Sequence, residues 1–170
     1  MRLVAVNAAL RSGAAFIVAV VADPFSEETF FSDGVSAFRR AAGTDTPLAP
    51  SARSTLVDLN FDPPFRSAPA FRTVTLAADP GFVSSFRPRV VSTSLALTWV
   101  ATGQRAAYVT DGDPRESVHF AAGLAICEAA GCTVTDLRGG AWRRGAPGLI
   151  AAADAETHAA LLRLVRKYLA

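Results

Sequence analysis

The first half of the chain has the pattern of short strands separated by turns. Val4–Leu10 alternates with the two-residue period of a half-buried strand, and Phe16–Val21 is an apolar run rich in β-branched residues. Because Ser12-Gly13 marks a turn between them and Asp23-Pro24 ends the second run, we predict a hairpin. The other elements expected here are strands at 29–32, 35–38 and 54–61, a polar loop at 42–54 and an imperfect helix at 67–78. Residues 1–84 are therefore expected to form a strand-rich layer.

From residue 86 onward, short apolar runs alternate with segments of helical periodicity. Ser92 is expected to cap a helix that carries Leu95 and Trp99 and ends at Gly103, because hydroxyl side chains favour the N-cap and glycine favours the C′ position. The other elements expected are strands at 87–91, 106–109, 133–135 and 148–152, a helix at 117–130 that ends at Gly131, and a final helix capped by Asp154. This alternation predicts an α/β layer at 85–170, so the fold class is α/β in an α+β layered arrangement and residues 1–170 form one domain.

Composition and charge narrow the function classes. The chain is 51% hydrophobic and 19% charged, which excludes a disordered protein. Its 17 basic and 15 acidic residues are scattered and leave a net charge of +2, so a nucleic-acid partner is not expected. The longest apolar stretch, Ala14–Ala22, is shorter than the roughly 20 residues of a membrane span. Asn7 and Arg11 interrupt the N-terminal apolar region, so we expect no signal peptide, no membrane association and a cytoplasmic location.

A series of spaced segments carries a resemblance to a known family. In order, the segments read A-V-V-A-D-P at 19–24, V-A-T-G at 100–103, A-A-Y at 106–108, V-H-F-A-A-G at 118–123, E-A-A-G at 128–131 and V-T-D at 134–136. The series resembles the inositol monophosphatase family of Mg²⁺-dependent sugar phosphatases over residues 3–164. The resemblance implies an inositol monophosphatase-like fold, in which an antiparallel strand-rich layer is followed by a mixed α/β layer. If the chain is an enzyme, the resemblance implies a phosphoric monoester hydrolase.

The sequence departs from this family where its metal site belongs. The family holds Mg²⁺ with a Glu on an early strand, a D-P-[IL]-D-G-[ST] loop and the Asp of a W-D-x-A-A-G motif, all of which supply the oxygen ligands that Mg²⁺ requires. The strand at Val4–Leu10 matches the one that follows this loop, so the Glu and the loop have no counterpart in the sequence. His119 stands at the position of the motif's Asp. We therefore expect no metal ligands, no cofactor and no counterpart of the family's N-terminal helices.

The resemblance also suggests candidate site residues. His119, at the start of a helix on the cleft wall, is the candidate catalytic residue and could act as a general base or as a hydrogen-bond donor. Alternatively, it is a remnant of a lost metal site, and its side chain is hydrogen-bonded to a carbonyl or to Asp113. Asp111 and Asp113 precede it, and either could contact substrate hydroxyls or belong to a solvated turn. Ser92 and Thr93 could contact a substrate at a helix start or only cap that helix.

Three functional hypotheses fit these features. The first is a member of the family without phosphatase activity, which acts as a small-molecule binding or scaffold subunit or reuses the cleft around His119 without metal. The alternatives are one part of a split phosphatase, whose missing loop comes from a separate chain, and a phosphatase with a misassigned start. Because two helices cover the outer face of the first sheet in the family, we expect a homodimer or a partner chain to cover that face here.

Overall fold

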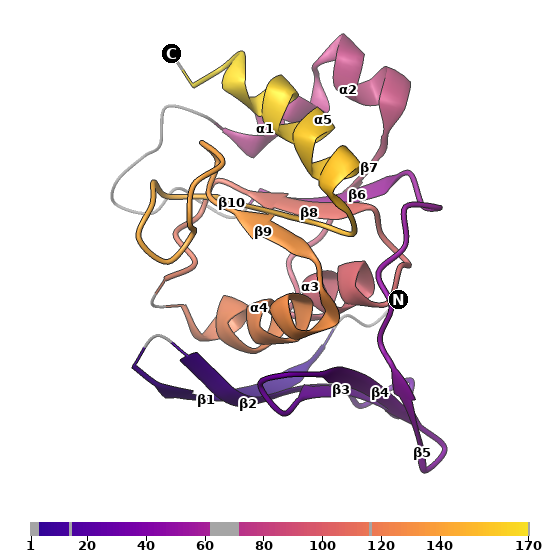
Figure 1. The fold of residues 1–170 in the computed structure, drawn as a ribbon. Coiled ribbons are helices and arrows are strands. Elements are labelled where there is room, and N and C mark those ends of the chain that lie inside the picture. The colour runs from indigo at the N-terminus through magenta and orange to yellow at the C-terminus, as the bar shows by residue number, and fades with distance from the viewer. Residues whose placement is uncertain (1–3, 14, 62–71, 116, 170) are drawn as a thin grey trace.

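The structure is a computed structural model that describes residues 4–13, 15–61, 72–115 and 117–169. Its described elements stack in layers (Figure 1). The first five-stranded sheet is followed by helices α3 (Leu95–Ala101) and α4 (Val118–Ala130), then by the second five-stranded sheet, and then by α1 (Thr73–Ala77), α2 (Pro80–Ser85) and α5 (Ala155–Arg166). The predicted fold class, with an antiparallel layer followed by a mixed layer, is confirmed.

The first sheet is antiparallel throughout, in the order β1-β2-β3-β4-β5. Its strands are β1 (Val6–Ser12), β2 (Ala15–Asp23), β3 (Glu28–Ser32), β4 (Ala37–Ala41) and β5 (Thr44–Pro47). The predicted hairpin of β1 and β2 is confirmed. The polar loop expected at 42–54 is wrong in part, because β5 lies within it. Ala42 and Gly43, with φ of 48° and 76°, make the tight turn that pairs β5 with β4. The residues of β5 are exposed, so they carry no apolar period.

The second sheet is mixed, in the order β7-β6-β8-β10-β9. Its strands are β6 (Leu56–Asn60), β7 (Arg87–Val90), β8 (Ala107–Thr110), β9 (Thr133–Thr135) and β10 (Leu149–Ala152). The strand predicted at 54–61 belongs to this sheet rather than to the first layer, so the layers divide between β5 and β6 instead of after residue 84. The reason is that β6 runs parallel to β7 and β8 and is buried on both faces from Val57 to Asn60, unlike a half-buried strand of the first sheet.

The helices are α1 (Thr73–Ala77), α2 (Pro80–Ser85), α3 (Leu95–Ala101), α4 (Val118–Ala130) and α5 (Ala155–Arg166). Of the helix expected at 67–78, residues 67–71 lie outside the described residues. The cap predicted at Ser92 is wrong, because the N-cap of α3 is Ser94, and Thr93 Oγ1 accepts the amide of Leu95 at 3.3 Å. The predicted end of α4 at Gly131, with φ of 88°, and the Asp154 cap of α5 are confirmed.

Helix α2 was not predicted from the sequence. Asp79 caps it, since its carboxylate accepts the amide of Phe82 at 2.9 Å, and Pro80 follows at the first helical position. A short helix of six residues has little apolar period, and the Asp-Pro pair was the signal available.

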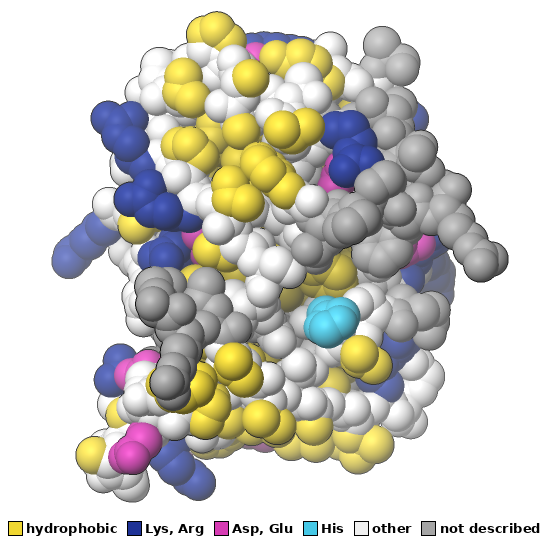
Figure 2. Space-filling model, turned by 180° about the vertical axis from the view of Figure 1, so that it is seen from behind, with side chains coloured by type: hydrophobic (Ala, Val, Ile, Leu, Met, Phe, Trp, Pro, Cys, Tyr) yellow, Lys and Arg dark blue, Asp and Glu magenta, His cyan; other side chains and the backbone are white. Residues whose placement is uncertain are grey.

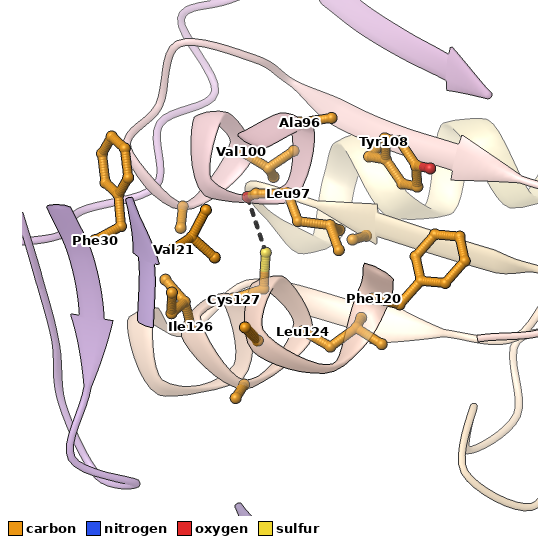
Figure 3. Close-up of a cluster of buried hydrophobic side chains, with 14 of the residues drawn as sticks. Val21, Phe30, Ala96, Leu97, Val100, Tyr108, Phe120, Leu124, Ile126 and Cys127 are labelled. Atoms are coloured by element: carbon orange, nitrogen blue, oxygen red, sulfur yellow. Dashed lines mark hydrogen bonds between the residues drawn. The ribbon is translucent and has the colours of Figure 1, made fainter. Parts of the chain in front are cut away.

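Two hydrophobic cores lie on either side of the second sheet, and the first of them encloses α3 and α4. Figure 3 shows side chains of β2, α3 and α4 pointing toward one another, with the Cys127 thiol donating to the Leu97 carbonyl at 3.1 Å. A hydrogen bond with Cys132 and complete burial raise the pKa of the Cys127 thiol well above its usual value. Among the described helices, none has the length and apolar character needed to cross a membrane.

Candidate functional site

A cavity of about 340 Å³ opens where the start of the chain, the end of β6 and the N-terminal ends of α3 and α4 converge. Its described lining consists of Val4, Ala5, Asn60, Ser92, Thr93, Ser94, Leu97, Tyr108, Ser117, His119 and Phe120. Three of the residues predicted from the sequence, Ser92, Thr93 and His119, therefore come together at one cavity. Their roles toward a ligand remain predictions.

The inner wall of the cavity carries two buried polar side chains, Asn60 and Tyr108. They lie on the adjacent parallel strands β6 and β8, and the Asn60 amide donates to the Tyr108 hydroxyl at 2.9 Å. This contact orients the amide and the hydroxyl at the end of β6, where strand ends of an α/β sheet commonly meet ligands. Sequence reasoning missed both residues. The available signal was a polar residue near the end of each predicted strand, Asn60 in 54–61 and Tyr108 in 106–109.

The loop before α3 places hydroxyl groups on a second wall. Ser94 Oγ accepts a hydrogen bond from the Asn7 side chain at 3.0 Å, which ties the inner face of the first sheet to the start of α3. Thr93 Oγ1 accepts from the backbone amide of Leu95. Because each of these hydroxyl oxygens accepts from the protein, each hydroxyl proton is suited to donation toward a ligand.

His119 also lines the cavity, as the second residue of α4, and it is exposed. If His119 were a remnant of a lost metal site, Asp113 was one of the groups that could hold it, but the structure does not form this contact. Asp113 instead pairs with Arg115, whose Nε donates to Oδ1 at 2.7 Å, and this hydrogen bond lowers the pKa of the Asp113 carboxyl. The imidazole is exposed and lines the cavity, where it could donate to or accept from a ligand.

The two aspartates predicted to contact a substrate do not line the cavity. Asp111 is buried, its Oδ2 accepts from Arg72 Nε at 2.6 Å, and it also accepts the backbone amide of Thr73 at 3.3 Å. Asp113 is held by Arg115. Each carboxylate thus forms an ion pair with an arginine of the protein, so the geometry does not support contact of either carboxylate with a ligand in this cavity.

The residues around the cavity do not fit the Mg²⁺ that the resemblance implies. The lining residues that the structure describes offer five hydroxyls, one amide and one imidazole, but no carboxylate. Within residues 4–13, 15–61, 72–115 and 117–169 there is also no group of three His, Cys, Asp or Glu side chains placed to hold a metal ion. Mg²⁺ is a hard cation that proteins usually bind through carboxylates, and imidazole suits it poorly.

Comparison with known proteins assigns the family. The sequence model described as the inositol monophosphatase family matches residues 1–170. The chain belongs to the inositol monophosphatase family. The predicted resemblance is thereby confirmed. No curated protein matches the chain in sequence.

Solved structures of the inositol monophosphatase family share the fold. The chain is similar to an IMPase from Thermotoga maritima, with 20% identity and a TM-score of 0.77, over 97% of this chain and 61% of that one. It is similar to the extragenic suppressor protein SuhB of Bartonella henselae (23% identity, TM-score 0.76, 96% and 61% coverage) and to SuhB of Mycobacterium tuberculosis (23%, 0.73, 98% and 65%). The chain thus spans less than two thirds of the length of each of these relatives.

Proposed function

We propose that this chain is a member of the family that binds a small, uncharged polyhydroxylated molecule in the cavity beside His119 and does not hydrolyse phosphate esters. The observation that carries the proposal is the chemistry of the described lining, which has many hydrogen-bonding groups but neither a carboxylate nor a Lys or Arg side chain. A cytoplasmic location, without nucleic-acid or membrane partners, is part of the proposal.

Polyols fit this lining in two ways. Their hydroxyls both donate and accept, which matches the Asn60 amide, the Tyr108 hydroxyl and the hydroxyls before α3. Their C–H surfaces can pack on the apolar part of the wall, formed by Leu97 and Phe120. A volume of about 340 Å³ is at the small end of the range of ligand sites, so the ligand is of the size of a single sugar or cyclitol ring.

A phosphate ester fits less well. Enclosing a phosphate dianion without a cation is unfavourable, because the ion loses its hydration and gains no opposite charge. In the family, the resemblance implies that bound Mg²⁺ supplies this charge and activates the attacking water. The described lining does not fit Mg²⁺ and so offers a phosphate ester no such metal at this cavity.

Calorimetric titration of the purified chain with inositol, several hexoses and inositol phosphate tests the ligand class. We expect the uncharged compounds to bind and His119→Ala to weaken that binding by about tenfold, the loss of one hydrogen bond, while the melting temperature stays unchanged. Val118→Ala, a change at the exposed neighbouring position of α4, is the control and should bind as the unaltered chain does. Tighter binding of inositol phosphate than of inositol would contradict an uncharged ligand, and wild-type affinity of His119→Ala would remove His119 from the site.

Assays of inositol, fructose and nucleotide phosphates with Mg²⁺ test the second half of the proposal. We expect no turnover, because the described lining does not supply the carboxylate ligands with which a protein usually holds Mg²⁺ and its activated water. Mg²⁺-dependent, Li⁺-sensitive hydrolysis by the purified chain would refute it.

The alternative is that further sequence completes a Mg²⁺ site at this cavity, from a separate chain or from codons upstream of Met1. The coverage of less than two thirds of each relative favours it. It predicts that the in-frame upstream codons spell a D-P-x-D-G-T loop, or that hydrolysis appears only when a second chain is added.

A further inference from the structure

A second cavity, of about 450 Å³, lies beside the last turn of α4. It shares no described lining residue with the cavity beside His119. Its lining comes from the end of β1, the last turn of α4, β9 and the loop after β9, and includes Arg11, Glu128, Val134, Trp142, Arg143 and Arg144. The volume falls within the range of small-molecule sites, so this cavity can hold a ligand of its own.

The described lining of the second cavity carries more positive than negative charge. Three arginines, Arg11, Arg143 and Arg144, stand against the single carboxylate of Glu128, an excess of two positive charges. Elsewhere in the described chain, the arginines that form ion pairs do so one to one with a carboxylate. Figure 2 shows Lys and Arg side chains in separate groups on the face that it draws, several of them beside Asp or Glu. The second cavity therefore concentrates positive charge that its described residues do not neutralise.

Glu128 is already engaged by two of its neighbours in the lining. Its carboxylate accepts from Trp142 Nε1 and Arg143 Nη1 at 2.9 Å each, and from Arg143 Nη2 at 2.6 Å. The Arg143 guanidinium also lies over the rings of Trp142 and Phe16, at 4.7 and 5.3 Å from their centroids, where a cation is attracted to an aromatic ring. These contacts fix the loop after β9 against α4 and β2, and they leave Glu128 little capacity to neutralise a further cation.

Arg11 and Arg144 are the two cations left to meet a ligand. Both are exposed, and within the part of the chain that the structure describes neither forms an ion pair. Arg11 donates to the Gly13 carbonyl at 3.5 Å, and its guanidinium lies 5.6 Å from the centroid of the Phe16 ring that Arg143 also contacts. Because like charges gathered at one cavity repel each other, an anion bound among them is stabilised.

We propose that the second cavity binds a small dicarboxylate, with one carboxylate on Arg11 and the other on Arg144. A guanidinium group binds a carboxylate through two parallel N–H···O bonds, so two free arginines on separate elements suit two separate carboxylates. The carbon chain between the carboxylates packs on the apolar part of the lining, which Val134 and Trp142 provide. A compact anion such as inorganic phosphate carries its charge on one group and leaves this apolar part uncovered.

Tryptophan fluorescence of the Trp99→Phe chain tests the proposal, because Trp142 is then the only tryptophan and it lines this cavity. We expect succinate and glutarate to change the emission saturably at low ionic strength, and about 150 mM salt to weaken their binding because both arginines are exposed. Acetate should bind at least about tenfold more weakly, since it pairs with one arginine alone, and inorganic phosphate should also bind more weakly. Calorimetric titration of the unaltered chain should give the same order. A phosphate ester that enters this cavity is recognised by the same signal, which separates it from binding beside His119.

The variant Arg11→Ala with Arg144→Ala should weaken succinate binding at least about tenfold, because it removes both charged partners of the ligand. The matched control is Arg53→Ala with Arg163→Ala, which removes the same charge from two exposed positions outside the described lining and should bind as the unaltered chain does. Circular dichroism should show that all variants are folded. No saturable binding of succinate or glutarate, or binding that survives the loss of Arg11 and Arg144, would overturn the proposal. Tighter binding of phosphate than of either dicarboxylate would also overturn it, since one compact anion would then be the ligand.

Discussion

The approach of α3 to α4 positions two walls of the cavity, and Gly123 permits that approach. Gly123 lies in the middle of α4, facing Leu97 of α3 in the first core. A Cβ atom at position 123 would stand 2.8 Å from Leu97 Cβ and 2.9 Å from Leu97 Cδ1. Carbon atoms pack favourably at about 3.5–4.0 Å, so Gly123→Ala forces the two helices apart.

Two opposing effects determine how much Gly123→Ala changes the free energy of unfolding. Alanine is a better helix former than glycine by about 1 kcal/mol, which alone would stabilise the chain. Overpacking a close-packed core costs about 1–3 kcal/mol, and Leu97 is buried in such a core. We therefore expect Gly123→Ala to destabilise the chain by about 1 kcal/mol. The sign of the change distinguishes a close helix contact from a loose one.

A double-mutant cycle with Leu97→Ala tests the contact itself. Leu97→Ala alone should cost about 2–5 kcal/mol by leaving a cavity. In the double variant the Cδ1 clash is gone and the new methyl group of Ala at 123 fills part of the space. The Cβ of residue 97 remains, so the relief is partial, and the two costs should fall short of additivity by about 1 kcal/mol.

Urea unfolding followed by circular dichroism measures these differences, at one protein concentration because association would contribute to stability. We also expect Gly123→Ala to weaken ligand binding, since it moves Thr93 on the α3 side away from His119 at the start of α4. A Gly123→Ala chain more stable than the unaltered one, or an additive cycle, would refute the reasoning.

Two further predictions concern titratable groups. The Asp79 carboxylate accepts from the Tyr168 hydroxyl at 2.6 Å and from Lys167 Nζ at 3.2 Å, and hydrogen bonding, above all from Tyr168, lowers its pKa to about 2. Since the folded pKa is lowered, its stabilisation should be present above about pH 4 and lost as the pH falls toward 2, and melting curves of Asp79→Asn should lack that acid loss. Cys127, whose pKa is raised by its hydrogen bond with Cys132 and by burial, should react with a thiol reagent only on unfolding. Rapid labelling of Cys127 itself in the folded chain, located by peptide mass spectrometry to separate it from the partly exposed Cys132, would contradict this.

Elements with local signals could be predicted from the sequence, and those set by distant contacts could not. The end of α4 at Gly131 and the start of α5 after Asp154 follow from a left-handed glycine and a capping carboxylate. The place of β6 in the second sheet depends on its pairing with β7 and β8, which lie up to 50 residues away. Within β6, Asp58 and Asn60 gave the alternation of a half-buried strand although both are buried.

In the candidate site, too, contacts between residues far apart in the sequence could not be predicted. Two of these contacts pair carboxylates that lie near the cavity-lining strands. On β6, two residues from Asn60, Asp58 is fully buried and its Oδ1 accepts from Arg105 Nε at 2.8 Å, and burial raises the pKa of its carboxyl although Arg105 opposes the shift. Past the end of β8, Asp111 is held in the same way by Arg72. No local pattern reveals such pairs, because Asp58 and Arg105 are 47 residues apart. Neither carboxylate belongs to the described lining of the cavity, so the described polar groups beside His119 are uncharged, which is the observation on which the proposed uncharged ligand rests.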